Sequence, residues 1–205
     1  MNLKPERVFH YFRELSDIPR ESHNEKAVSD YIYNFGKKLG LETKQDDILN
    51  VYMRKPATKG YENKPGIILQ GHMDMVCEKA TSSKHNFATD KIEWVIKDDL
   101  LFANNTTLGA DDGIAVAMGL AILEDKEAKH PALELLVTTD EERTMAGARA
   151  VKRELLNGRK LLNIDAEEEG VLLSGCSGGH NIVGTLKVKY EKSDMKNTFV
   201  LFVNN

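Results

Sequence analysis

The sequence predicts an α/β fold with a mostly parallel sheet that is flanked by helices. Two observations carry this prediction. Short apolar runs that suit buried strands recur along the chain, and longer segments with apolar residues at helical spacing lie between them. Strands that alternate with helices are typical of a mostly parallel sheet. The 205 residues are enough for one domain with a substantial core and for the start of a second domain.

Four segments have the pattern of helices. The first covers residues 5–15, where apolar residues recur at helical spacing. Residues 22–25 (Ser-His-Asn-Glu) form a capping-box pattern, which predicts the start of a second helix that Gly40 ends. Two further helices are expected at residues 113–124 and 146–156.

The expected strands are short apolar or alternating runs, and several suit a strand that is buried on both faces. After Gly179 the sequence changes character. We therefore expect one domain over residues 1–180 and a distinct segment over residues 181–205. That segment opens with an alternating run like an edge or lid strand and contains an apolar run at residues 198–203. Strands are expected at residues 48–53, 66–70, 133–139, 161–164 and 171–173, and a hairpin at residues 92–96 and 100–103.

Composition excludes several classes of protein. The formal net charge of −4, without a basic run, argues against a nucleic-acid partner. No apolar stretch reaches the roughly 18 residues of a membrane span, and the first residues lack the apolar core of a signal peptide. A soluble, cytoplasmic protein is therefore expected. Cys77 and Cys176 lie far apart, and we expect both to be small buried apolar residues rather than ligands or a disulfide.

One histidine and several acidic residues follow the predicted strands. Open α/β folds place their chemistry at the carboxyl ends of strands. His72 and Asp74 are two residues apart, so in a strand both side chains point to the same side. A histidine binds a metal well when a carboxylate accepts its other ring N–H, and Asp74 is placed for that task. The candidate residues are His72, Asp74, Asp111, Glu141, Glu142 and Asp165.

The remaining acidic candidates suit a site for two metal ions. Asp111 lies between Gly109 and Gly113, and its carboxylate could bridge two cations about 3.5–4 Å apart. Alternatively, Asp111 or Asp112 could cap the following helix, and this alternative is strong for Asp112; the two roles can also be divided between the two residues. Adjacent carboxylates such as Glu141 and Glu142 could divide metal binding from proton transfer, although such pairs are also common in solvated loops.

Asp165 ends an apolar strand and would be a terminal metal ligand. The acidic residues 167–169 beyond it are expected to be solvated. Residues 175–179 (Gly-Cys-Ser-Gly-Gly) lack the strand and helix that flank a nucleophilic serine, and they are interpreted as a turn. The other histidines, which are expected to be structural or exposed, are His10, His23, His85, His130 and His180.

Four motifs together resemble those of the M20-type metallopeptidases. Residues 70–79 and 162–170 are similar to the aminoacyl-histidine dipeptidase branch in particular, and the resemblance covers residues 3–189. It implies a zinc-peptidase-like catalytic domain, of which residues 1–180 are the N-terminal part and residues 181–205 begin a lid or dimerisation domain. The motifs are residues 72–76 (His-Met-Asp-Met-Val), 109–113 (Gly-Ala-Asp-Asp-Gly), 140–142 (Asp-Glu-Glu) and 163–165 (Asn-Ile-Asp).

The resemblance implies two zinc ions, which Co²⁺ or Mn²⁺ could replace. His72 and Asp165 would bind the first ion. Glu142 would bind the second, and Asp111 would bridge the two. The peptide bond between Asp111 and Asp112 is often cis in this family.

The resemblance also implies a reaction, the hydrolysis of Xaa-His and similar dipeptides. Glu141 would be the general base that activates a water molecule bridging the metals, and it would then pass the proton to the leaving amine. Asp74 would orient His72.

Members of this family are considerably longer than this chain. They insert the lid domain near the position of Gly179 and then return to complete the catalytic domain, and the returning segment supplies the last histidine ligand. Neither part is recognisable here, so a truncated product or an aberrant tail is expected, and a homodimer is expected only of the full-length form. Two alternatives stay open: an inactive remnant that binds at most one metal, and a related aminopeptidase, tripeptidase or deacylase.

Overall fold

The computed structural model describes residues 3–166, 168, 170–175, 178, 183–187, 189, 192 and 194. The chain divides into two units, residues 1–167 and residues 168–205. The helices and strands that the described residues form all lie in the first unit. The candidate residues lie in the same unit, so the site is described within it.

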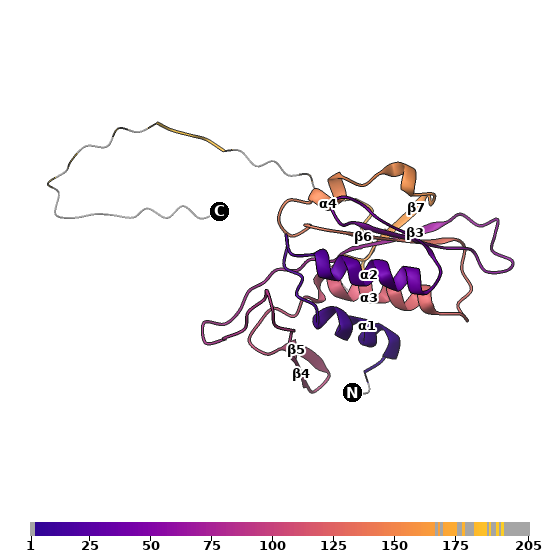
Figure 1. Cartoon of the computed structure of the whole chain (residues 1–205), viewed down its shortest axis with the longest axis horizontal. Helices are drawn as coiled ribbons and strands as arrows, with labels where there is room; N and C mark the ends of the chain where they lie inside the picture. Colours follow the sequence, from indigo (N-terminus) through magenta and orange to yellow (C-terminus); the bar gives the residue numbers. More distant parts are fainter. Residues whose placement is uncertain are drawn as a thin grey trace. The chain divides into compact units, whose positions relative to one another are not determined.

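A five-stranded sheet forms the centre of this unit, with its strands in the order β1-β2-β6-β3-β7 (Figure 1). β3 pairs in parallel with β6 and β7, whereas β1, β2 and β6 pair antiparallel. The predicted α/β class is confirmed, and the sheet is mixed, with two parallel and two antiparallel pairs. The parallel pairs, which were expected to predominate, lie in the half of the sheet that carries the candidate residues. The strands are β1 (Glu42–Gln45), β2 (Val51–Lys55), β3 (Ile67–His72), β6 (Leu133–Thr138) and β7 (Lys160–Asn163).

Parallel pairing brings the carboxyl ends of three strands to one edge of the sheet. In the register of the sheet, His72 lies opposite Thr138, and Gln70 lies opposite Asn163. The segments that follow β3, β6 and β7 therefore leave the sheet side by side. Ligand sites of open α/β sheets form at this edge.

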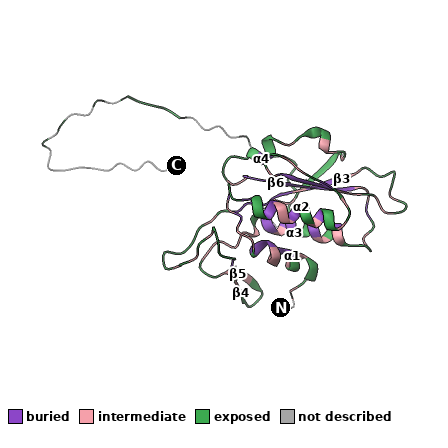
Figure 2. Ribbon diagram, viewed as in Figure 1, coloured by how far each residue is buried: buried purple, intermediate pink, exposed green. Residues whose placement is uncertain are grey.

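Three helices cover one face of the sheet (Figure 1). α2 and α3 contact the strands directly, and α1 packs on α3. Alternate strand residues such as Met53 and Leu135 form the main core together with Leu120 of α3. Figure 2 shows buried stretches along β3 and β6 and on parts of the helices. A Cβ at Gly119 would lie 2.6 Å from Leu135, so this glycine allows α3 to approach the sheet closely. The helices are α1 (Glu6–Ser16), α2 (Lys26–Lys38) and α3 (Ala110–Glu124).

A short segment covers the other face, and here the predicted helix 146–156 is wrong in extent. Only α4 (Ala146–Arg149) and a 3₁₀ turn, η1 (Arg153–Leu155), are helical. Between them Lys152 is extended, with φ −86° and ψ 111°. The extended link lets the apolar side chains of the segment reach the sheet, and this packing prevails over helix continuation. The contacts join Val151, Leu155 and Leu156 to Tyr52, Ile68 and Leu136.

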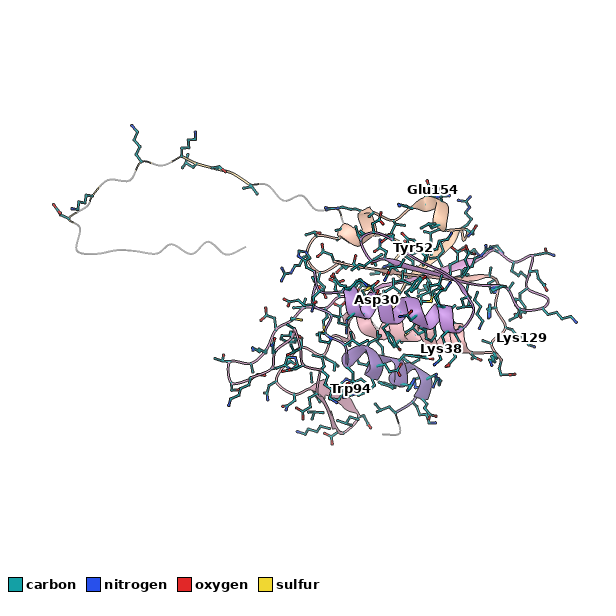
Figure 3. All side chains as sticks on the ribbon, viewed as in Figure 1. Asp30, Lys38, Tyr52, Trp94, Lys129 and Glu154 are labelled. Carbon is teal, nitrogen blue, oxygen red and sulfur yellow. The ribbon has the colours of Figure 1, made fainter. Side chains whose placement is uncertain are left out.

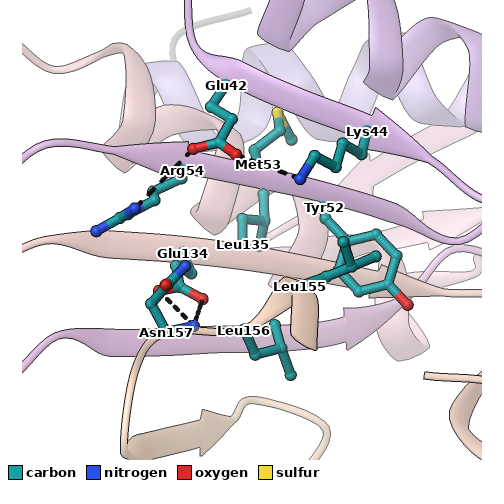
Figure 4. A pocket seen from close by; sticks show the side chains of 10 residues that line it. All are labelled: Glu42, Lys44, Tyr52, Met53, Arg54, Glu134, Leu135, Leu155, Leu156 and Asn157. Atoms are coloured by element: carbon teal, nitrogen blue, oxygen red, sulfur yellow. Dashed lines mark hydrogen bonds and ion pairs between the residues drawn. The ribbon is translucent and has the colours of Figure 1, made fainter. Parts of the chain in front are cut away.

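The same face carries a pocket between the strands and this segment (Figure 4). Glu134 is buried at its wall, and its carboxylate accepts hydrogen bonds from the backbone N–H groups of Asn157 and Gly158. Glu42 forms ion pairs with Lys44 and Arg54 at the rim. None of the predicted site residues lines this pocket. The hydrogen bonds of Glu134 thus join this segment to β6.

A separate hairpin of β4 (Trp94–Lys97) and β5 (Leu100–Ala103) confirms the expected hairpin. Trp94 anchors it beside α1 (Figure 3). Its ring lies 5.2 Å from that of Phe12, and its Nε1 donates a hydrogen bond to Ser16 Oγ at 3.0 Å. None of the helices in the described residues has the length and apolar character needed to cross a membrane.

The predicted capping box at residues 22–25 is wrong. α2 begins at Lys26, and its N-cap Glu25 makes no side-chain capping bond. The two side chains of the motif bind elsewhere. Ser22 Oγ donates to Asp74 Oδ2 at 2.7 Å, and Glu25 Oε1 accepts a hydrogen bond from the backbone N–H of Asp140 at 3.1 Å.

The other differences concern weak strands. β1 was not predicted, because it is a polar edge strand in which only Thr43 is buried. The described residues 171–173 are not a strand. The described residues 183–187 and 189 are not a strand either, contrary to the expected strand at 181–190. Residues 198–203, the turn residues Cys176, Ser177 and Gly179, and residues 181, 182, 188 and 190 lie outside the described residues.

Candidate metal centre

His72 stands at the centre of the site, at the end of β3, with its side chain 1% exposed. Its Nδ1 lies 3.3 Å from Asp74 Oδ1. Its Nε2 faces the opposite side, 3.0 Å from Asp111 Oδ1. Burial opposes the charged imidazole, but the carboxylate of Asp74 and the charges of Asp112 and Asp165 raise the pKa of His72 to about 9. The ring therefore sits in a strongly negative environment.

Asp74 holds the buried side of the imidazole. The residue is fully buried, and its carboxylate accepts three hydrogen bonds besides its contact with the ring. The donors are Ser22 Oγ and the backbone N–H groups of Glu141 and Glu142, at 2.7, 3.1 and 3.2 Å. Burial works against ionisation, but His72 and these donors outweigh it and lower the pKa of Asp74 to about 2. Asp74 thus joins the end of β3 to the loop after β6.

The start of α3 brings two aspartates to His72, one to its ring and one to its backbone N–H. The side chain of Asp111 is 64% exposed, and its Oδ1 reaches Nε2. The peptide bond between Asp111 and Asp112 is cis. The side chain of Asp112 does not cap the helix, which was the strong alternative for this residue, because its Oδ2 accepts the backbone N–H of His72 at 3.1 Å. Burial raises the pKa of Asp112 to about 7.

Gly71 makes this approach of Asp112 possible. A Cβ at position 71 would lie 2.5 Å from Asp112 Oδ2. The strand therefore needs glycine one residue before the histidine. The sequence alone does not explain this glycine, because the requirement comes from packing between β3 and α3.

The loop after β6 supplies the pair Glu141 and Glu142. Asp140 adopts a left-handed backbone with φ 50°, which aspartate tolerates better than most residues, and this bend turns the next two N–H groups toward Asp74. Glu141 Oε2 lies 3.8 Å from His72 Nε2. Burial and neighbouring carboxylates raise the pKa of both Glu141 and Glu142 above the ordinary value, despite the opposing effect of His72.

Asp165 arrives from the end of β7. The backbone N–H of Ile164 still donates to Gln70 O at 3.1 Å, so the strand pairing guides the chain toward the site. Asp165 Oδ2 then lies 3.8 Å from His72 Nε2. Its side chain is 30% exposed.

The donor set fits divalent metal ions. Ligand atoms of His72, Glu141 and Glu142 lie within 4.8 Å of one another, and so do those of His72, Asp112 and Asp165. Imidazole and carboxylate donors suit Zn²⁺ and related ions. The raised pKa values of the two glutamates reflect burial and, after it, repulsion by neighbouring carboxylates, and a cation would relieve this repulsion.

The structure therefore brings the other five predicted residues around the imidazole of His72. The sequence did not predict the contacts that Asp112, Ser22 and Arg20 make with the site. Asp112 accepts the His72 N–H, Ser22 donates to Asp74, and Arg20 donates to backbone oxygens beside the site. Ser22 was read as a helix cap and Asp112 likewise, because both fit local capping patterns, while Arg20 carried no signal in the sequence.

The other residues considered lie away from this cluster or at its margin. Cys77 is half-buried rather than buried, and burial raises the pKa of its thiol to about 11. His10 and His23 are exposed, as expected, and His23 Nε2 lies 3.0 Å from Asp140 Oδ1. His130 is buried in a loop. Cys176 and His180 lie outside the described residues.

Comparison with known proteins finds relatives that are named as peptidases. No family model matches the chain. The chain is 38% identical over 189 residues to the cytosol non-specific dipeptidase of Escherichia coli. The matched region covers 92% of this chain and 39% of that protein. The chain therefore spans about two fifths of the length of this relative.

Solved structures agree with this similarity. The fold superposes on the aminoacylhistidine dipeptidase of Vibrio alginolyticus with a TM-score of 0.81 and 41% identity, over 82% of this chain and 34% of that one. A tripeptidase of Staphylococcus aureus gives a TM-score of 0.66 and 25% identity, over 81% of this chain and 44% of that one. Sequence and fold thus confirm the predicted similarity of this chain to the M20-type peptidases. The two relatives named as dipeptidases are more similar to it than the tripeptidase is.

Proposed function

We propose that the chain carries most of the catalytic centre of a dinuclear zinc dipeptidase that hydrolyses Xaa-His and similar dipeptides. The observation that carries the proposal is the convergence of carboxylates from the ends of β6 and β7 and from the start of α3 on His72 Nε2, at the end of β3. Relatives named as dipeptidases are more similar to the chain than the tripeptidase is, which favours dipeptides as substrates.

Four residues would hold the metals. His72 and Asp165 would bind the first zinc ion, Glu142 would bind the second, and Asp111 would be a ligand shared by both. Zinc ions bound there would polarise the scissile carbonyl and stabilise the negative charge that develops on its oxygen. Co²⁺ or Mn²⁺ could take the same positions.

Glu141 is proposed as the general base. Its side chain is 28% exposed and lies at the open side of His72, so a water molecule can reach it. Burial and neighbouring carboxylates raise the pKa of Glu141, which makes its carboxylate a better proton acceptor. Glu141 takes a proton from the attacking water and then gives it to the leaving amine.

Asp74 is proposed to act through His72. Its carboxylate lies beside Nδ1, 3.3 Å away, and fixes the ring orientation and tautomer so that Nε2 faces the metal side. Because Asp74 also accepts the N–H groups of Glu141 and Glu142, it sets the position of the proposed base relative to the histidine.

We place the complete protein in the cytoplasm, like the relative whose name calls it cytosolic, and we propose a homodimer for the complete form. We also propose that residues 1–180 belong to the catalytic domain and residues 181–205 to the start of a lid domain. Dipeptides are the proposed partners; we propose neither nucleic acid nor a membrane.

Metal stoichiometry and hydrolysis test the proposal together. The zinc-to-protein ratio of the dialysed chain is measured by elemental analysis, and amine release is followed with Xaa-His dipeptides, tripeptides and acyl-amino acids. We expect two zinc ions and dipeptide hydrolysis that Glu141→Gln abolishes and Glu154→Gln, an exposed change on η1, leaves intact.

Other outcomes assign the alternatives. One zinc ion without hydrolysis supports the inactive remnant, and preferred cleavage of tripeptides or acyl-amino acids supports a related peptidase or deacylase. Retained hydrolysis in Glu141→Gln would contradict the assignment of the base.

A further inference from the structure

Arg20 is a buried cation beneath the candidate metal centre. It lies in the link between α1 and α2 and is 2% exposed. Its Nη1 donates hydrogen bonds to the backbone oxygens of Met73 and Asp74, at 3.0 and 3.1 Å. Its Nη2 donates to the backbone oxygen of Gly109. One guanidinium thus binds both the loop after β3 and the turn before α3.

The turn before α3 is shaped around this guanidinium. A Cβ at Gly113 would lie 2.6 Å from Arg20 Nη2, and a Cβ at Gly109 would also collide with it. Gly109 has φ +69°, a backbone that favours glycine. Both glycines of the motif 109–113 therefore serve a packing purpose, which is room for the arginine fork.

The residues after Arg20 extend the same contact. The backbone oxygen of Arg20 accepts the N–H of Met75 at 3.1 Å, and Glu21 pairs with Met75 as a parallel bridge. Ser22 then binds Asp74, and Glu25 binds the loop after β6 at Asp140. Residues 20–25, which we call the buttress, therefore contact the loop after β3, the turn before α3 and the loop after β6.

We propose that Arg20 is a positioning residue of the metal centre, whose fork fixes the loop of His72 relative to the turn of Asp111. His72 Nε2 and Asp111 Oδ1 come from these two segments and meet at 3.0 Å. The proposal rests on the proposed function, because the two side chains matter together only if they bind metal.

Shape, and not charge alone, is the property that this role needs. The guanidinium is a planar fork that reaches two directions at once, whereas a lysine ammonium is a compact point charge. Burial lowers the pKa of Arg20 to about 10, although Asp74 and the neighbouring aspartates oppose this, so the group stays charged at neutral pH. Arg20→Lys therefore keeps the charge and removes the fork.

The experiment compares zinc affinity by calorimetric titration, and amide exchange of the metal-free chain, in Arg20→Lys, Arg20→Met and Gly113→Ala. Gly113→Ala keeps the arginine but places a methyl group against its fork. The matched control is Leu123→Ala, a core truncation 12 residues beyond Asp111 and thus about 18 Å along α3. It lowers stability without touching either loop.

We expect the three test variants to bind zinc roughly 10- to 100-fold more weakly, while Leu123→Ala binds it like the wild-type chain. In the metal-free test variants, the amides of His72 and Glu141 should also lose protection. Wild-type affinity and protection in Arg20→Lys would overturn the proposal.

The arms separate the two hypotheses. If the wild-type chain binds no zinc, the proposed function fails, and the amide exchange of the metal-free variants still decides whether the fork holds the loops. If Arg20→Met does not fold, the two milder variants decide. Equal weakening of zinc binding in Leu123→Ala would mean that general stability, not Arg20, sets the affinity.

Discussion

Two carboxylates on opposite sides of His72 have contrasting surroundings. Asp74 is fully buried, accepts three hydrogen bonds from the protein, and has a pKa of about 2. Glu141 is partly exposed, and burial and like charges raise its pKa. The lone pairs of Asp74 are occupied by protein donors, whereas Glu141 keeps its lone pairs available. The buried side of the imidazole thus serves structure, and the open side is free for a ligand or a proton.

The largest expected effect comes from Asp74→Ala. The change leaves Ser22 and the N–H groups of Glu141 and Glu142 without an acceptor in a buried place, and each unsatisfied group costs about 1–3 kcal/mol. We expect the free energy of unfolding to fall by about 3–5 kcal/mol in urea denaturation.

Glu141→Gln is the control on the other side of the ring, and it should change the free energy of unfolding by less than about 0.5 kcal/mol. Equal losses in the two variants would break the contrast between a structural and an available carboxylate.

Metal addition and removal test the open side. Zinc at about a hundredfold excess over its dissociation constant should raise the free energy of unfolding by about 2.7 kcal/mol, and a chelator should reverse this. Asp165→Asn should reduce the gain, and Glu154→Gln should not. Thermal melts with zinc and with chelator measure it. A gain that Asp165→Asn leaves untouched would remove Asp165 from the proposed ligands.

Gly71→Ala tests the packing of Asp112 against β3, on the buried side of His72. Its Cβ would meet Asp112 Oδ2 at 2.5 Å and disturb the hydrogen bond from the His72 N–H. We expect a loss of about 1–3 kcal/mol in the free energy of unfolding. Gly66→Ala, where the nearest atom is at 3.4 Å, is the matched control and should lose much less. Equal losses would show that the loss reflects glycine replacement in general.

Cys77 provides the smallest expected effect, three residues beyond Asp74. Burial and Glu21 raise the pKa of its thiol to about 11, although Arg20 lowers it. Only the thiolate reacts, so the alkylation rate in a Cys176→Ser background should rise about tenfold per pH unit through pH 9 and 10. A free cysteine, with a pKa of about 8.5, would level off there. Early levelling would mean that the buttress cation outweighs burial at this position.

Local sequence identified the site well where a residue ends a strand. His72, Asp111 and Asp165 follow from strand ends and glycine punctuation, and the structure brings them together, although their roles as ligands stay a prediction. Ser22 and Asp112 were assigned to helix caps because they match capping patterns. Their actual partners lie 52 and 40 residues away, and local patterns carry no information about such contacts.

The fold shows the same division. Buried strands such as β3 and β6 were predicted within a few residues, because apolar runs mark them. The polar edge strand β1 lacks that mark, and its pairing with β2 defines it instead. Residues 150–156 fit a helical pattern, but packing of Val151 and Leu155 on the sheet prevails over it.

The buttress and the three strand ends have a consequence for how the centre forms during folding. The hydrogen bond from Asp140 to Glu25 spans 115 residues, and that from Glu141 to Asp74 spans 67. Long-range contacts of this kind close large loops and form late. During synthesis, the cluster cannot assemble until Asp165 has left the ribosome, so metal capture should report the completion of folding rather than guide its first steps.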